Sequence, residues 1–308
     1  MTAKKSGWLF FLMVMIYIGA MIALSVDAIA KKFTMEGLLW LTEGIVVVPS
    51  LLFLLTAGEP VKETLALHKI RIPTLFLSVV YVALLGPLVT LCNAVTMLFT
   101  ENAAVDMLTT TSSLSVAKMF FFIGILAPVC EECVFRGILY SGFRKNGTPL
   151  QAILWTAVLF GLFHMNLNQM VYAIVLGVAF GLLREATGNI WAGIIGHMSL
   201  NSFNVFLFYV QDMLLKEPVE TEQVSQITTR DSYLMIIGVY LVIAFFATIL
   251  AACVLALIAK VEYGQEYLAK VWSDRRKLRV WSVPLWIGIA ICLGLIILNS
   301  LPVANLAG

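Results

Sequence analysis

Two adjacent glutamates, Glu131 and Glu132, lie inside an apolar stretch of the sequence. Burying an ionised carboxylate in a membrane costs at least roughly 2.5 kcal/mol, so ionisable residues in such stretches are usually functional. Two of the three histidines, His164 and His197, also fall within apolar stretches. Carboxylates and imidazoles transfer protons and activate water. This combination predicts catalytic chemistry within a membrane.

Helical spacing assigns different roles to the two glutamates. Glu132 and Arg136 are four residues apart, so they share a helix face and should form an ion pair. Glu131 is turned away from that face, and we expect it to act as a general base. The alternative is that both glutamates only neutralise Arg136, although one carboxylate would suffice.

Each of the two apolar-stretch histidines has a partner one helical turn away. Phe160 precedes His164 by four residues, and Asn201 follows His197 by four. Either histidine alone would more commonly be an interhelical hydrogen-bonding residue. Together they predict that a water held between Glu131 and His164 is activated, while His197 and Asn201 donate hydrogen bonds to an oxyanion. Such a site would hydrolyse an acyl bond, and in a membrane we expect a peptide bond.

Three motifs in this order on successive helices resemble the CPBP family of intramembrane proteases. That family includes the type II CAAX prenyl endopeptidases and bacterial proteins linked to bacteriocin self-immunity. The resemblance covers residues 131–201, and the flanking segments add no signature to it. The motifs are Glu131-Glu132-x-x-x-Arg136, Phe160-x-x-x-His164 and His197-x-x-x-Asn201.

The resemblance implies an all-helical bundle with a cavity that opens toward the cytoplasmic side. It implies that Glu131 activates water with help from His164. It further implies that His197 and Asn201 stabilise the oxyanion and that the glutamate–arginine pair holds the helix. These implied roles agree with those expected from helical spacing.

Metal use is left open by the resemblance, because the family is often labelled as metalloprotease and a metal-free mechanism has also been argued for it. A catalytic zinc ion could be bound by Glu131, His164 and His197. The sequence has no His-Glu-x-x-His motif, and we expect no obligatory metal. A structural zinc site that combines Cys130 and Cys133 with two histidines is a less favoured alternative.

The composition places these motifs in a polytopic membrane protein. The chain is 61% hydrophobic and 12% charged, about half the charged share of a soluble protein. We expect one all-α domain over residues 1–308, with a catalytic core at 118–210 and peripheral helices at 8–99 and 234–303. Apolar stretches predict a bundle of about eight or nine membrane-spanning helices, near 8–28, 37–57, 74–99, 118–142, 150–165, 170–184, 188–210, 234–259 and 282–303.

Charge bias predicts a cytoplasmic N-terminus, because the segments that would then face the cytoplasm carry most of the Lys and Arg residues. The basic loop 260–281 belongs inside, where it would lie against anionic lipid, and the acid-rich loop 211–233 belongs outside. The first apolar run has no small-residue cleavage site before Asp27, which favours a retained helix over a signal peptide. The compact chain suggests a bacterial plasma membrane.

The predicted function is an intramembrane endopeptidase that acts on a membrane-embedded, prenylated or otherwise lipidated peptide. The alternative is a non-catalytic protein for membrane peptide binding or bacteriocin self-immunity. The intact set of polar residues argues against it, because a pure binding protein could lose any one of them. A secondary transporter ranks third, because the sequence shows no internal repeat. The net charge of +2 lies in short loops, and we expect no nucleic-acid partner.

Overall fold

The computed structural model describes residues 1–215, 230–275 and 282–300. These residues form an all-α bundle without β-strands, which confirms the predicted fold class. Parts of the predicted loops 211–233 and 260–281 lie outside the described residues.

Within those ranges, six helices are long and apolar enough to cross a membrane. The shorter apolar helix α10 (Pro149–Phe163) and the helix α12 (Trp191–Leu215) occupy two more of the nine predicted stretches. Together they identify an integral membrane protein, because a membrane-spanning helix satisfies its backbone hydrogen bonds internally. The six are α1 (Ala3–Leu24), α3 (Met35–Thr56), α5 (Ile72–Thr96), α11 (Leu167–Thr187), α14 (Arg230–Val261) and α16 (Val283–Ser300).

The predicted span at 118–142 is one unbroken helical run, and two stretches of it are π-helical. Its segments keep right-handed helical dihedral angles at each junction. A π-helical turn shifts the phase of the side chains that follow it, and such turns occur often at functional sites. The run consists of α7 (Val116–Met119), η1 (Phe120–Leu126), α8 (Ala127–Glu132), η2 (Cys133–Leu139) and α9 (Tyr140–Asn146).

Local capping signals set the ends of α10 and α11. A capping box between Thr148 and Gln151 starts α10. The side chain of Asn166 accepts a hydrogen bond from the backbone of α11 and starts that helix, and Gly188 ends it in the left-handed conformation. These caps make α11 longer than the stretch predicted at 170–184, where polar residues near both ends had lowered the hydropathy.

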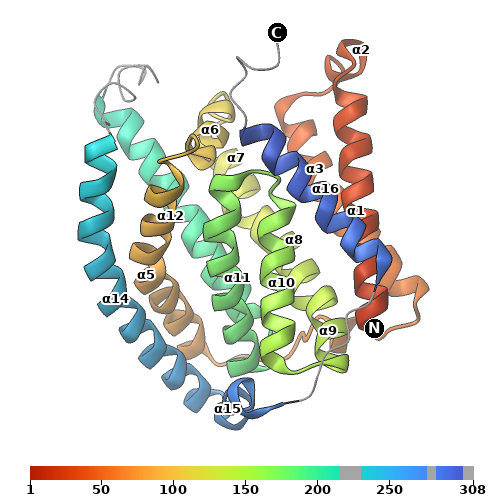
Figure 1. Cartoon of the computed structure of the whole chain (residues 1–308), viewed down its shortest axis with the longest axis vertical. Helices are drawn as coiled ribbons and strands as arrows, with labels where there is room; N and C mark the ends of the chain where they lie inside the picture. Colours follow the sequence, from red (N-terminus) through yellow and green to blue (C-terminus); the bar gives the residue numbers. More distant parts are fainter. Residues whose placement is uncertain (216–229, 276–281, 301–308) are drawn as a thin grey trace.

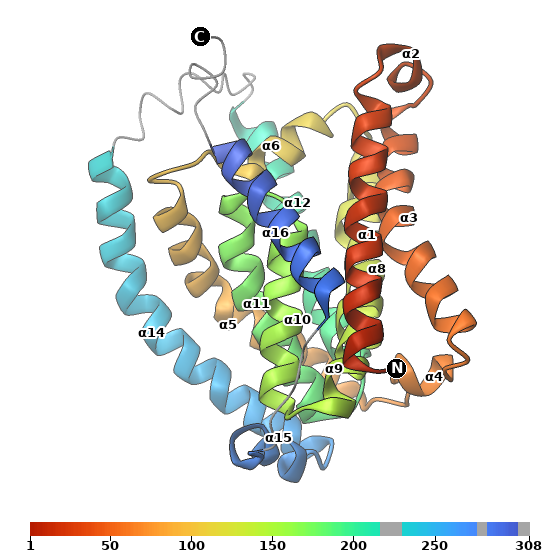
Figure 2. The ribbon, with the colours of Figure 1, turned by 45° about the vertical axis from the view of Figure 1, so that its right-hand side comes forward.

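The pair α10 and α11 lies in the middle of the bundle (Figures 1 and 2). A Cβ at Gly177 would come within 2.7 Å of the Cα of Ala157, so the small residues allow these two helices to pack closely. α5, α12 and α14 lie on one side of the pair, and α1, α3 and α16 lie on the other.

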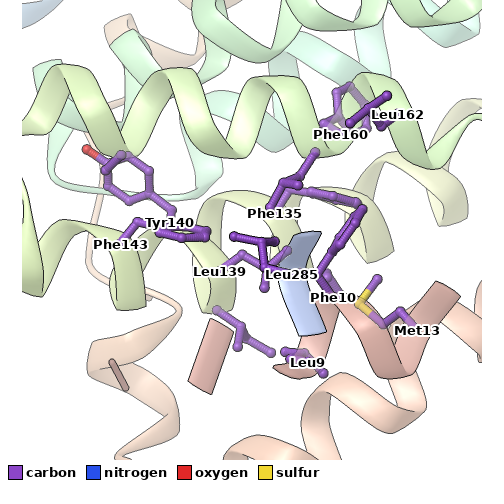
Figure 3. Close-up of a cluster of buried hydrophobic side chains, with 14 of the residues drawn as sticks. Leu9, Phe10, Met13, Phe135, Leu139, Tyr140, Phe143, Phe160, Leu162 and Leu285 are labelled. Carbon is purple, nitrogen blue, oxygen red and sulfur yellow. The ribbon is translucent and has the colours of Figure 1, made fainter. Parts of the chain in front are cut away.

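A hydrophobic core joins the central helices to α1 and α16. Figure 3 shows Leu9 and Phe10 of α1, Phe135 of η2 and Leu285 of α16 in one buried cluster. The outer faces behave differently, because large apolar side chains such as Phe245 of α14 are exposed there. Such faces are suited to contact with lipid acyl chains.

Short helices occupy segments that the sequence predicted as loops. They are α2 (Asp27–Ala30), α4 (Val61–Thr64), α6 (Ala103–Thr110) and α15 (Gln265–Ser273). Only Val271 of α15 is buried among its residues, so this helix rests on the end of the bundle by one edge.

Candidate active site

Glu132 is the most enclosed ionisable residue of the predicted site. Its side chain is fully buried, with Oε1 lying 3.0 Å from Nη1 of Arg136 and 3.2 Å from Nδ1 of His197. The ion pair expected from the four-residue spacing is therefore present, and it also reaches a histidine on α12. Breaking such a buried pair would leave an uncompensated charge.

Arg136 is held between aromatic rings as well as by its carboxylate partner. The guanidinium carbon lies 4.2 Å from the ring centroid of Phe160 and 5.2 Å from that of Phe180. Its contact with Glu132 is a charge pair without the alignment of a hydrogen bond. Favourable cation–π contacts thus replace part of the lost hydration of this buried cation.

His197 lies between the two glutamates. Its Nδ1 faces Glu132, and its Nε2 lies 3.6 Å from Oε2 of Glu131. The imidazole stacks on the ring of Phe180, with centroids 4.9 Å apart. Because Oε1 of Glu132 is the atom nearest to Nδ1, we place a proton of the ring in that contact, and Nε2 then faces Glu131. The stacking and the carboxylate together fix the orientation of the ring.

Glu131 is more accessible than its neighbour. Its side chain is 22% exposed, whereas that of Glu132 is 0% exposed. This difference fits the predicted separation between a carboxylate that pairs with Arg136 and one that remains available for chemistry. Glu43 of α3 is a third carboxylate close to Glu131, and one of its oxygens is buried without a hydrogen-bond partner among the described residues.

His164 lies at the C-terminal end of α10, against Phe160. Its Nδ1 lies 2.8 Å from the carbonyl oxygen of Phe160, and the two rings meet edge to face at 4.9 Å. The ring of Phe160 also meets His197 at 6.0 Å, so one aromatic residue separates the two imidazoles. Among the described residues, the hydrogen bonds and ion pairs of Glu131 connect it to His197 and not to His164.

Asn201 lies one turn after His197 on α12 and binds the neighbouring helical run. Its side-chain amide donates to the carbonyl oxygen of Ile123 at 3.2 Å. That carbonyl belongs to the π-helical stretch η1. The hydrogen bond therefore fixes α12 against the helix that carries the glutamates.

A residue that the sequence reasoning did not identify, Gly193, allows α12 to approach the site. A Cβ at this position would lie 2.8 Å from Oε2 of Glu132. A side chain at this position would therefore force the buried carboxylate to shift from its contacts. A single sequence offers no direct signal for such a contact, because it depends on how two distant helices face each other.

The site residues do not fit a three-ligand metal centre. Within the described ranges, no group of three or more His, Cys, Asp or Glu side chains could hold a metal ion. Both ring nitrogens of His197 face carboxylates, and Nδ1 of His164 faces the carbonyl oxygen of Phe160. Cys130 and Cys133 are free thiols that join no such group. We therefore assign no chemical step to a metal.

The region that carries these residues is also the region that matches a known protein family. Residues 113–203 match the sequence model of the family described as "Type II CAAX prenyl endopeptidase Rce1-like". A protein of Bacillus subtilis (strain 168) named "Putative membrane peptidase YdiL" is 29% identical over 93 residues, which is 30% of this chain and 38% of that protein. No solved structure matches the chain. Residues 113–203 of this membrane protein, which contain the site residues, are therefore similar to that peptidase family.

Proposed function

We propose that the protein is an intramembrane endopeptidase that hydrolyses a peptide bond of a membrane-associated or lipidated peptide. The observation that supports this proposal is the position of His197 between a buried, charge-paired glutamate and a more accessible one. A pure binding or self-immunity protein would not need this ordered set of proton-transfer groups. The match of residues 113–203 to a peptidase family supports the same class of reaction.

In the proposed reaction, Glu131 takes a proton from a water molecule, and the water oxygen attacks the carbonyl carbon of the substrate. The resulting oxyanion accepts hydrogen bonds from Nε2 of His197, as the imidazolium, and from the side chain of Asn201. Glu131 then gives its proton to the leaving amine nitrogen as the carbon–nitrogen bond breaks. His164 is expected to provide a second contact for the water.

The distance between Glu131 and His197 suits this chemistry. With Oε2 and Nε2 3.6 Å apart, a water bound to the first and a carbonyl oxygen bound to the second would lie side by side. Such proximity favours attack, because the reacting groups are held within bonding reach. Glu132 would stabilise the positive charge of the His197 imidazolium, which keeps both ring protons throughout the proposed reaction.

The substrate and the membrane are part of the proposal. The description of the matched family names prenylated CAAX proteins, and the bacterial relative is named only as a membrane peptidase. We therefore propose a lipidated or membrane-inserted peptide as substrate, and a bacterial plasma membrane with the N-terminus in the cytoplasm as location.

A profile of new peptide ends in membranes tests the proposal. Cells that produce the wild type are compared with cells that produce Glu131→Gln, with Glu266→Gln as a matched control, because Glu266 is 82% exposed on α15. We expect ends that appear with the wild type and the control but not with Glu131→Gln. If all three profiles agree while each protein is folded and present, the catalytic function is refuted and the binding or immunity alternative is favoured.

A further inference from the structure

A cavity with several charged side chains in its wall lies away from the paired glutamates. Its lining residues belong to the end of the bundle that carries the N-terminus, α9 and α15, and Figures 1 and 2 show these elements near one another. Its volume is about 490 Å³, and residues of α4, α9, α11 and α15 line it. Tyr140 in its wall follows Glu132 by eight residues, or about 12 Å along the helix. The cavity is therefore separate from the candidate active site.

Two carboxylates in the wall of this cavity already have partners. Glu185 accepts a hydrogen bond from Nε of Arg144 at 2.9 Å and another from the hydroxyl of Tyr140. Glu59 forms ion pairs with Lys145 at 3.3 Å and with the N-terminal ammonium of Met1. Both acidic groups are thus paired with cations other than Arg184.

Arg184 is the cation of the wall that lacks a carboxylate partner among the described residues. Its Nε is buried without a hydrogen-bond acceptor, and its guanidinium lies 5.9 Å from the ring centroid of Tyr140. The remaining carboxylate of the wall, Glu63, is exposed and forms no ion pair with it. A buried guanidinium nitrogen that lacks an acceptor can donate a hydrogen bond to an anion that enters the cavity.

We propose that this cavity binds a phosphate group through Arg184, with Arg144 beside it. The two arginines are close enough to interact electrostatically, and both line the cavity. A guanidinium presents a planar fork of donors that matches the oxygens of phosphate. The group belongs either to a phospholipid headgroup or to free phosphate. The predicted sidedness places this end at the cytoplasmic face, where anionic headgroups are available.

The test uses the full chain and two probes. Inorganic phosphate is titrated into the detergent-purified protein by calorimetry. Retention of phosphatidylglycerol is measured by native mass spectrometry after release from nanodiscs of phosphatidylcholine and phosphatidylglycerol. Wild type is compared with Arg184→Gln and with Lys62→Gln, which removes an exposed cation from the same end without altering the cavity wall. Loss of charge-assisted hydrogen bonds should weaken binding about tenfold or more in Arg184→Gln alone.

The two arms distinguish the sources of the phosphate. Binding of inorganic phosphate that depends on Arg184 identifies free phosphate, and dependence seen only for the lipid identifies a headgroup. If Arg184→Gln fails to fold, Arg184→Lys is tested in its place, because lysine keeps the positive charge but lacks the planar fork of donors. Arg184→Lys should bind the phosphate probe more weakly than Lys62→Gln does. Equal affinity of all variants, or no binding of either probe by the wild type, overturns the proposal. Neither result depends on peptidase activity.

Discussion

The central region, residues 116–215, and the flanking helices bury different kinds of polar side chain. In the flanking α3 and α5, the hydroxyls of Ser50 and Ser78 donate to carbonyls of their own helix at 2.7 Å. In the central region, Glu132 instead contacts His197 of a different helix at 3.2 Å. A hydroxyl can be satisfied locally, whereas a buried charge requires a partner from elsewhere. The buried charge of Glu132 therefore fixes how two helices of the central region face each other.

The two regions also differ in how much of their apolar surface is enclosed. Half of the most apolar window of α11 is buried, against 22–28% in the five other described helices of spanning length. α11 thus packs against protein over half of this window, whereas the five other helices leave a larger share of theirs accessible at the surface. A site that must exclude lipid and control water is expected in the first environment.

The largest difference between the regions should appear when one partner of an ion pair is removed. Arg136→Met leaves Glu132 buried without its cation, and we expect the free energy of unfolding to fall by about 3–5 kcal/mol. Chemical denaturation in detergent measures the change. The matched control is Lys31→Met. Lys31 directly follows α2 and pairs with Asp27 across the same four-residue spacing as Glu132 and Arg136, but both side chains of this pair are exposed. This control should change stability only slightly, and a similar loss in both variants would contradict the comparison.

A smaller difference is expected when a methyl group is added to a helix glycine. Gly193→Ala forces a Cβ to within 2.8 Å of Oε2 of Glu132, so we expect destabilisation of about 1–3 kcal/mol. Thermal unfolding in the same detergent measures it. In the flanking α14, a Cβ at Gly238 meets no atom within 4 Å, and Gly238→Ala should be neutral or stabilising. If Gly238→Ala destabilised the protein as much as Gly193→Ala, the close contact between Gly193 and Glu132 would not explain the loss of stability.

The smallest effect is expected from metal removal. Because no three-ligand group gathers at Glu131, His164 and His197 in the described structure, cleavage should persist after dialysis against a strong chelator. Production of the new peptide ends by the dialysed protein measures this. Loss of cleavage that is restored by added zinc would show that the site rearranges to bind a metal.

Local spacing predicted much of the central architecture. The four-residue separation of Glu132 and Arg136 predicted a contact that the structure contains at 3.0 Å. Apolar runs predicted the helices, and their ends differ from the predicted positions by a few residues where caps decide them. For α11 the helix extends three residues beyond the predicted stretch at each end, because Asn166 and Gly188 cap it outside the apolar residues.

The relative rotation of distant helices was not predictable in the same way. The sequence suggested His164 as the partner of Glu131, but the structure places His197 beside it at 3.6 Å. Two π-helical stretches flank the glutamates and shift the phase of their side chains, and a helical wheel cannot show that shift. Gly193 was missed for the same reason, since its role depends on the approach of α12. The catalytic roles of Glu131, His164, His197 and Asn201 remain predictions.

The central claim is that Glu131 and His197 act as one catalytic unit. Once the profile of peptide ends has supplied a substrate peptide, the cleavage rates of Glu131→Gln, His197→Gln and the double variant can be measured in nanodiscs. We predict that each single variant loses about 10²-fold or more and that the double variant is no slower than the slower single variant, because residues that act as a unit are not additive. Losses that multiply in the double variant would contradict the claim.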